Sequence, residues 1–260
     1  MTMEQTYLEK RNNRVVKANE LIQKSRFSLS LQQQKIVLYL ISQIMPSDEE
    51  FKLYDFSISE FCKVCGIDYY SGKNYADLKA AIKDIADKSL WIKLPTGKET
   101  LIRWIEKPYI DEKSGIIEIK LDEDMKPFLL QLKENFTQYE LLWTLKFKSK
   151  YTIRLYELVK SIHYHDINEY RRVFTLDELR RMLGAETYKT YQAFKERVLE
   201  PAINEINAFS DKNVDYRTEK TGRSVSRIML IVSSKDTIDQ LKLQSEIEKE
   251  FELGQMSLWG

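Results

Sequence analysis

The chain has 260 residues, 43% hydrophobic and 12% aromatic, a composition that fits a folded globular protein and excludes a disordered one. No apolar run approaches the ~18 residues of a membrane span, no apolar signal region opens the chain, and two cysteines do not form a secreted disulfide framework. We therefore expect a soluble, cytoplasmic protein without membrane contact. The formal net charge is +1, which on its own argues against a nucleic-acid partner.

The charges are distributed unevenly along the chain. Basic residues exceed acidic ones by four over residues 1–35 and by five over residues 137–235. Acidic residues exceed basic ones by four over residues 36–136 and again over residues 236–260. This asymmetry indicates contact with a polyanion through the basic parts, and the alternative is a random scatter of charges on solvated helices.

Three sequence blocks occur twice, in the same order and at offsets of 116 to 118 residues. The near-constant offset predicts two copies of one fold. The paired blocks are residues 36–41 with 153–158, 56–61 with 174–179, and 75–79 with 191–195. The repeat divides the chain into a basic N-terminal arm and leading helix (1–29), a first domain (30–136), a second domain (137–235) and an acidic C-terminal tail (236–260).

In the first copy, polar residues mark where helices begin. Ser30 with Gln33, and Ser57 with Glu60, have the spacing of a capping box, and Gly66 is expected to end the short helix that Ser57 starts. Hydrophobic periodicity supplies the remaining elements. In chain order we predict a helix from Ser30, an extended piece 53–56, the short helix, a long helix 72–88, strands 90–94, 100–106 and 115–121, and a linking helix 122–134.

The second copy repeats this order. Thr175 and Glu178 form a capping box, and Gly184 is expected to end the short helix. Helix, short strand, helix, turn, helix and β-hairpin is the order of a winged helix, so we predict an α+β fold of two tandem winged-helix domains related by the internal repeat. The predicted elements are helix 149–163, extended piece 172–174, the short helix, long helix 187–208, strands 214–219 and 225–233, and a charged terminal helix 236–252.

The long helix of the second copy is the predicted DNA-reading helix, because the third helix of such a unit lies in the major groove. Its inward stripe is expected to be Tyr191, Phe194, Val198, Ala202 and Ile206. Lys and Arg donate to guanine, Gln pairs with adenine, and Ala or Thr contacts a thymine methyl; the alternative is an ordinary solvated helix face. The outward residues are Lys189, Thr190, Gln192, Ala193, Glu196 and Arg197.

The β-hairpin of the second copy is the predicted wing. Basic side chains near its glycine-containing tip are expected to bind phosphate or enter a minor groove, and the alternative is a charged exposed hairpin. The residues concerned are Arg217, Lys220, Arg223, Ser224 and Arg227. Further phosphate contacts are predicted at the short helix and the strand before it, from Arg180, Arg181, Arg171 and Arg172.

The first copy carries a weaker set of candidates. Its long helix offers Lys73, Asn74, Lys79 and Lys83, and its predicted wing offers Lys98 and Arg103. The same helix also carries the carboxylates Asp77, Asp84 and Asp87. We therefore expect the first copy to bind DNA weakly or to contact other proteins.

Catalytic and metal-binding patterns are weak. His163 and His165 resemble the histidine pair of rolling-circle nickases, but that pair lies on a strand and this one ends a predicted helix. Cys62 and Cys65 form a single CxxC, and no second pair completes a zinc site. We expect no cofactor, no metal and no enzymatic activity. Four large aromatic residues are assigned to the core: Phe27, Trp91, Trp104 and Trp143.

Taken together, the blocks resemble the initiator replication proteins of iteron plasmids, the RepE, RepA and RepB type. The resemblance covers about residues 15–235 and rests on the order of its motifs. These motifs are VVKANEL at 15–21 before SLS at 28–30, FSISEF at 56–61, the segment 141–154, and FTLDELR at 174–180.

The resemblance implies that the protein is bacterial and binds tandem repeats of double-stranded origin DNA as a monomer. It also implies a homodimer formed through the first domain that represses its own gene, opening of the origin, and recruitment of the host initiator and helicase. The second domain would be the main reader, through Lys189, Thr190, Gln192, Ala193 and Lys195. The alternatives are a winged-helix transcriptional repressor without a replication role, and a nicking enzyme that uses His163 and His165.

Overall fold

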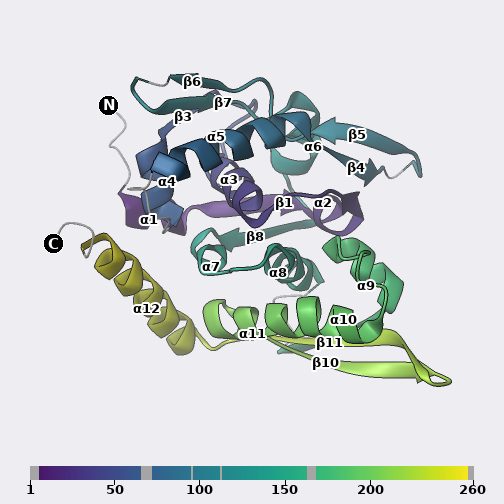
Figure 1. The fold of residues 1–260 in the computed structure, drawn as a ribbon. Coiled ribbons are helices and arrows are strands. Elements are labelled where there is room, and N and C mark those ends of the chain that lie inside the picture. Colours follow the sequence, from purple (N-terminus) through teal and green to yellow (C-terminus); the bar gives the residue numbers. More distant parts are fainter. Residues whose placement is uncertain (1–5, 66–71, 95, 112, 163–167, 257–260) are drawn as a thin grey trace.

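Two winged helices lie one above the other, and a long C-terminal helix runs from the second back to the first (Figure 1). This computed structural model describes residues 6–65, 72–94, 96–111, 113–162 and 168–256. Each unit mixes helices with a small antiparallel sheet, which confirms the predicted α+β fold. Within these ranges, every helix is too short or too polar to cross a membrane.

The elements up to Leu129 are α1 (Tyr7–Asn12), β1 (Arg14–Ala18), α2 (Asn19–Lys24), β2 (Ser25–Arg26), α3 (Leu31–Ile41), β3 (Tyr54–Ser57), α4 (Ile58–Cys65), α5 (Gly72–Asp87), β4 (Ser89–Lys93), β5 (Glu99–Arg103), β6 (Tyr109–Asp111), β7 (Ile116–Ile119), η1 (Glu123–Met125) and α6 (Lys126–Leu129). Those after it are β8 (Phe136–Glu140), α7 (Leu142–Leu145), α8 (Lys150–Ile162), β9 (Glu169–Thr175), α9 (Leu176–Leu183), α10 (Tyr191–Phe194), η2 (Lys195–Leu199), α11 (Glu200–Phe209), β10 (Lys212–Thr221), β11 (Ser224–Ser234) and α12 (Thr237–Met256).

The second winged helix has the predicted order of elements, with a sheet in the order β10-β11-β9. Thr175 Oγ1 accepts a hydrogen bond from Glu178 N at 3.2 Å, and the Glu178 carboxylate accepts one from Thr175 N at 2.8 Å. This capping box starts α9 as predicted. Gly184 ends it with φ of 65°, a left-handed conformation that glycine adopts without steric cost.

The long helix of the second unit packs as predicted. It begins at Tyr191 and continues through α10, a π-helical turn η2 and α11. The apolar stripe faces the core, because Phe194, Val198, Ala202 and Ile206 are all at most 1% exposed. The opposite face is therefore available to solvent or to a ligand.

The first winged helix carries a wing that differs from the predicted one. Its counterpart of the β10-β11-β9 sheet is the sheet β6-β7-β3, so the wing is the β6–β7 hairpin. The predicted wing, β4–β5, instead pairs with β2, where Arg26 faces Trp91. Alternating burial marks β4 as a half-buried strand but does not identify its partner. Lys98 and Arg103 consequently lie on an additional hairpin.

Two further expectations for the first unit need correction. Ser57 Oγ accepts a hydrogen bond from Glu60 N at 3.0 Å, but the Glu60 carboxylate accepts from Lys10 Nζ at 2.7 Å and does not close the capping box. The predicted linking helix 122–134 ends at Leu129, because Gln131 and Asn135 have φ of 50° and 54°. The Ser30–Gln33 box is complete, and Gly66 lies outside the described residues.

A strand pair joins the start of the chain to the start of the second unit. β1 pairs antiparallel with β8, so that Val15 faces Tyr139 and Lys17 faces Thr137. Residues 1–29 were expected as a basic arm, and β1 within them lies between the two winged helices (Figure 1). The four-part division of the chain therefore stays a prediction. The ladder joins the first predicted part, residues 1–29, to residues 136–140, which lie at the predicted border between the two domains.

The C-terminal helix α12 packs against the first unit. The guanidinium of Arg11 lies 2.7 Å from the Glu248 carboxylate, and it donates to Lys63 O at 2.7 Å and Val64 O at 3.0 Å, at the end of α4. The ring of Phe251 lies 4.4 Å from the same guanidinium. The acidic tail is thus a helix, as predicted, and it ties the end of the chain to the first unit.

The tryptophans divide into two groups. Trp104 and Trp143 are 1% and 4% exposed and belong to the core, and Phe27 packs edge-on against Trp104 at 4.9 Å. Trp91 is 48% exposed on β4, so its assignment to the core was wrong. Its neighbours Leu90 and Ile92 face inward, and strand alternation turns Trp91 outward.

Candidate nucleic-acid interface

The predicted reading helix presents its polar face to solvent. Thr190 Oγ1 accepts a hydrogen bond from Ala193 N at 3.1 Å and caps the helix, so this hydroxyl already has a structural role. Ala193 and Lys195 are half-buried. The exposed residues of the predicted set are Lys189, Thr190, Gln192, Glu196 and Arg197.

Two of the predicted base-contacting side chains already interact with carboxylates of the same helix. The Gln192 amide donates to the Glu196 carboxylate, and Lys195 Nζ lies 3.4 Å from the Glu200 carboxylate. A base that binds Gln192 must replace this partner, which favours only bases that form hydrogen bonds of equal quality. Glu196 and Glu200 therefore disfavour non-specific binding of DNA to this helix.

Arg180 was predicted to contact phosphate, and its burial contradicts this. It is 9% exposed, its Nη2 donates to Lys189 O at 2.9 Å, and its guanidinium lies 5.7 Å from the Phe194 ring centroid. Nη1 lies 3.2 Å from the Asp177 carboxylate. Arg180 therefore joins α9 to the start of the reading helix, which makes it a positioning residue.

The second wing extends as a long two-stranded ribbon (Figure 1). Gly222 has φ of 62° at the turn. The side chains of Arg217, Lys220, Arg223 and Ser224 are exposed there. Arg227 is exposed too, and its guanidinium lies 3.8 Å from the Glu219 carboxylate across the ribbon. Exposed cations of this kind have the chemistry of phosphate-contacting residues, so their role as DNA-backbone contacts stays a prediction.

The first-unit candidates are more scattered. Lys79 is exposed on α5, and Lys98 is exposed beside the turn between β4 and β5. Lys73 and Asn74 lie within α5, and their side chains are not among those the structure describes. Lys83 Nζ lies 2.6 Å from the Asp87 carboxylate.

The residues weighed for other chemistry are the histidine pair and the two cysteines. His163 and His165 lie outside the described residues. Cys62 and Cys65 are buried, and burial raises the pKa of the Cys65 thiol to about 12, so this thiol is unreactive at neutral pH. Across the described ranges, no group of three or more His, Cys, Asp or Glu could hold a metal.

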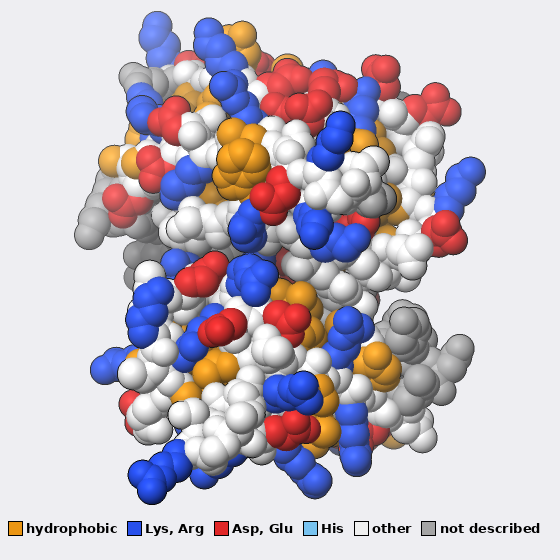
Figure 2. All heavy atoms as spheres, turned by 90° about the vertical axis from the view of Figure 1, so that its right-hand side faces the viewer, with side chains coloured by type: hydrophobic (Ala, Val, Ile, Leu, Met, Phe, Trp, Pro, Cys, Tyr) orange, Lys and Arg blue, Asp and Glu red, His pale blue; other side chains and the backbone are white. Residues whose placement is uncertain are grey.

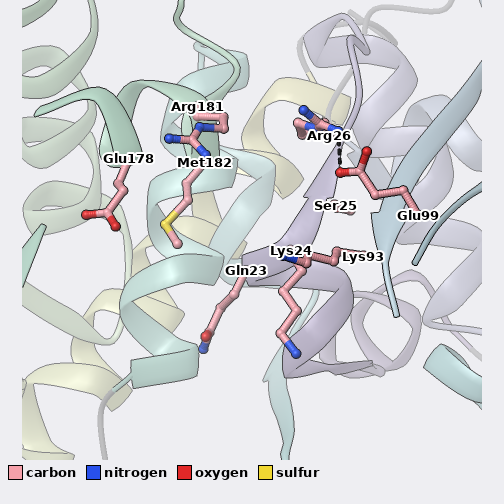
Figure 3. Close-up of a pocket in the computed structure, with 9 residues that line it drawn as sticks. All are labelled: Gln23, Lys24, Ser25, Arg26, Lys93, Glu99, Glu178, Arg181 and Met182. Atoms are coloured by element: carbon pink, nitrogen blue, oxygen red, sulfur yellow. Dashed lines mark hydrogen bonds and ion pairs between the residues drawn. The ribbon is translucent and has the colours of Figure 1, made fainter. Parts of the chain in front are cut away.

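A hollow of about 280 Å³ lies between the two units (Figure 3). Arg26 of β2 and Arg181 of α9 lie on opposite sides of it, and both are exposed. The other charged residues of its lining are Lys24, Lys93, Glu99 and Glu178. Sequence reasoning proposed Arg181 but missed this grouping, because the walls come from distant parts of the chain.

Buried charges lie beneath this hollow. Arg154 of α8 is 6% exposed and donates to Ser25 O at 3.3 Å and, through Nε, to Met182 O at 3.0 Å. Burial lowers the pKa of Arg154 to about 10, so it stays charged at neutral pH. Lys17 Nζ lies 2.6 Å from the Glu157 carboxylate, also buried. Glu157 is thus the ion-pair partner of Lys17, and it acts on Arg154 only through longer-range electrostatic attraction.

Figure 2 faces the side on which the β4–β5 and β10–β11 tips lie, and shows Lys and Arg side chains on both units with Asp and Glu between them. Tandem winged helices with an exposed helix face and a basic wing have the architecture of a DNA-binding protein. The chain belongs to the initiator replication protein family. Residues 14–160 match its first winged-helix domain (Initiator Replication protein, WH1), and residues 175–232 match its second (Initiator Rep protein, WH2).

Relatives agree with this assignment and confirm the resemblance. The chain is 26% identical over 253 residues to a replication initiation protein of Escherichia coli, covering 95% of this chain and 75% of that protein. It is 28% identical over 144 residues to the PI protein of Escherichia coli, covering 49% of this chain and 46% of that protein. The crystal structure of the Pi initiator protein in complex with iteron DNA has the same fold, with a TM-score of 0.71 and 19% identity over 87% of this chain and 99% of that one.

Proposed function

We propose that this protein initiates plasmid replication by binding tandem repeats of origin DNA, with the second winged helix as the main sequence reader. The observation that carries the proposal is the family match over both winged helices. The exposed face of the reading helix and the basic tip of the second wing support it. The Pi initiator, which shares the fold, was crystallised with iteron DNA.

The finer roles belong to the same proposal. The protein opens the origin and recruits the host initiator and helicase by binding alone, without a cofactor or a catalytic step. Its first winged helix adds DNA contacts and forms a homodimer that represses its own gene. The acidic carboxylates on α5, among them Asp84 and Asp87, support a first unit that binds DNA less strongly than the second.

The direct test is a gel-shift titration of the purified chain against duplexes that carry the repeats flanking its gene. We expect binding to these repeats to be about a thousand-fold tighter than binding to random duplex of the same length at physiological salt. Equal affinities would overturn the proposal.

A replicon assay separates initiation from repression. A plasmid that carries only this gene and its flanking repeats should be maintained in a suitable host. A protein that binds the repeats and lowers transcription of its own gene, but does not maintain the plasmid, would be a repressor.

A further inference from the structure

Some of the cationic side chains that line the hollow between the two winged helices form no ion pair with a described residue. Arg26 Nη2 lies 2.5 Å from the Glu99 carboxylate, and Lys24 Nζ lies 2.7 Å from Glu20. Lys93 and Arg181 are exposed, and neither forms an ion pair with any residue that the structure describes. Two cations from different winged helices therefore line one small space without an ion-pair contact, although Glu178 also lines it and interacts with Arg181 at longer range.

The charge beneath the hollow adds to this potential. Arg154 is hydrogen-bonded to backbone carbonyls of both walls, Ser25 O and Met182 O, and not to a carboxylate. The nearby buried carboxylate, Glu157, binds Lys17. Charges inside a protein are screened less than charges at its surface, so this excess cation attracts an anion in the hollow.

The wall beside Arg26 is apolar and exposed. Arg26 faces Trp91 across β2 and β4, and Trp91 faces Leu101 across β4 and β5. Trp91 and Leu101 are 48% and 51% exposed. A DNA backbone presents phosphates alternating with apolar deoxyribose faces, and this wall offers a cation next to an apolar pair. An inorganic anion would use the cations only.

We propose that the hollow binds a phosphate of the DNA backbone between the two winged helices, with Trp91 and Leu101 packed against the adjoining sugar. Arg26 exchanges the Glu99 carboxylate for this phosphate, and Arg181 contacts it from the second unit. The inference rests on the proposed function, because it assigns DNA as the ligand. It makes the junction, and not only the reading helix and wing, part of the interface.

Four variants test this: Arg181→Ala, Arg26→Ala, Glu99→Gln and, as the control, Lys249→Ala on the distant helix α12. Each is titrated with the flanking repeats and with random duplex at several salt concentrations, and thermal unfolding confirms that each is folded. We expect Arg181→Ala and Arg26→Ala to weaken binding to both duplexes roughly ten-fold at low salt and to reduce the salt slope by ~0.9 each. Glu99→Gln should tighten binding, because it releases Arg26.

A second readout is independent of affinity. Ethylation of single phosphates on the repeat should identify one phosphate whose modification weakens binding of the wild type but not of Arg181→Ala. The tryptophan fluorescence of the protein should fall when DNA binds. This decrease should be lost in the Trp91→Phe variant.

The outcomes separate this inference from the proposed function. If the wild type prefers the repeats but the hollow variants match Lys249→Ala, the inference is wrong and the function stands. If the wild type binds the repeats and random duplex equally well, the proposed function is wrong. A smaller salt slope of the hollow variants on random duplex would still support a phosphate site in the hollow. If the variants lose binding to polyglutamate but not to DNA, the hollow serves an acidic protein partner and the inference is overturned.

Discussion

At the scale of single residues, base reading and phosphate binding are assigned to different side chains of the second winged helix. Replacing Gln192 with Ala removes a base-reading group, so we expect altered preference at one or two positions of the repeat with little change in salt dependence. Arg223→Glu removes a phosphate contact and should weaken binding to all sequences, lowering the salt slope by roughly one. Binding measured on a library of substituted repeats at two salt concentrations distinguishes the two effects.

The control for that comparison is Glu196→Gln, which alters the carboxylate that binds Gln192 and leaves the amide of Gln192 in place. It should change affinity without changing which base is preferred. If Gln192→Ala and Arg223→Glu behave alike, the assignment of separate roles to helix and wing is wrong.

Lys212 lies at the base of the second wing and makes the stability of the protein depend on pH. Burial lowers its pKa to about 8, and its Nζ donates to Ser234 Oγ at 2.7 Å. Between pH 8 and about 10 the unfolded chain keeps this proton and the folded chain does not, so the free energy of unfolding should rise with pH by ~2 kcal/mol. Urea unfolding at several pH values should show this rise in the wild type and a smaller one in Lys212→Met, since other titrations are common to both.

At the scale of elements, α12 is held by one buried ion pair and one exposed pair, which provides a matched comparison. Glu248→Ala leaves the Arg11 guanidinium buried without its carboxylate and should lower the free energy of unfolding by ~3 kcal/mol. Glu250→Ala breaks the more exposed pair with Lys146 and should cost ~0–1 kcal/mol. Urea unfolding gives both values, and hydrogen exchange should show faster opening of α12 in Glu248→Ala only.

Elements set by neighbouring residues were predictable from the sequence, and those set by distant partners were not. Thr175, Glu178 and Gly184 fix both ends of α9 through atoms a few residues apart, so their spacing was sufficient. Nothing in the alternation of β4 indicates that it pairs with β2 and not within a wing.

The same distinction applies to the candidate site. The exposed face of the reading helix follows from helical periodicity and was predicted. The burial of Arg180 follows from its contact with Phe194 and Lys189, which depends on how α9 packs against the next helix. The hollow needs Arg26 and Arg181 on facing walls, an arrangement that only the folded chain creates.

At the scale of the whole molecule, a buried ion pair joins the two winged helices. The Glu157 carboxylate of α8 accepts from Lys17 Nζ of β1 at 2.6 Å and from the Tyr139 hydroxyl of β8 at 2.5 Å. Glu157→Leu leaves Lys17 buried without a partner and should lower the free energy of unfolding by ~3–5 kcal/mol. The double variant Lys17→Met with Glu157→Leu should recover most of this loss, as measured by urea unfolding. A double variant as unstable as the single one would contradict this account.

The structure also shows where the acidic and basic segments of the chain lie. The total of +1 combines a basic N-terminal arm and a basic second unit with an acidic first core and an acidic tail. In the structure the acidic tail is the helix α12, which packs on the first unit through Arg11 and Glu248. The acidic surfaces therefore lie away from the basic second wing, an arrangement that concentrates positive charge where DNA is proposed to bind.

The ladder between β1 and β8 also determines when the first unit can finish folding during synthesis. Val15 pairs with Tyr139, so β1 leaves the ribosome long before its partner strand exists. During that interval the nascent first winged helix carries an unpaired strand edge, which is a template for association with other chains. Expressing the two halves separately would make this state permanent in both of them, and a pause in synthesis would relieve it only once β8 (Phe136–Glu140) has left the ribosome.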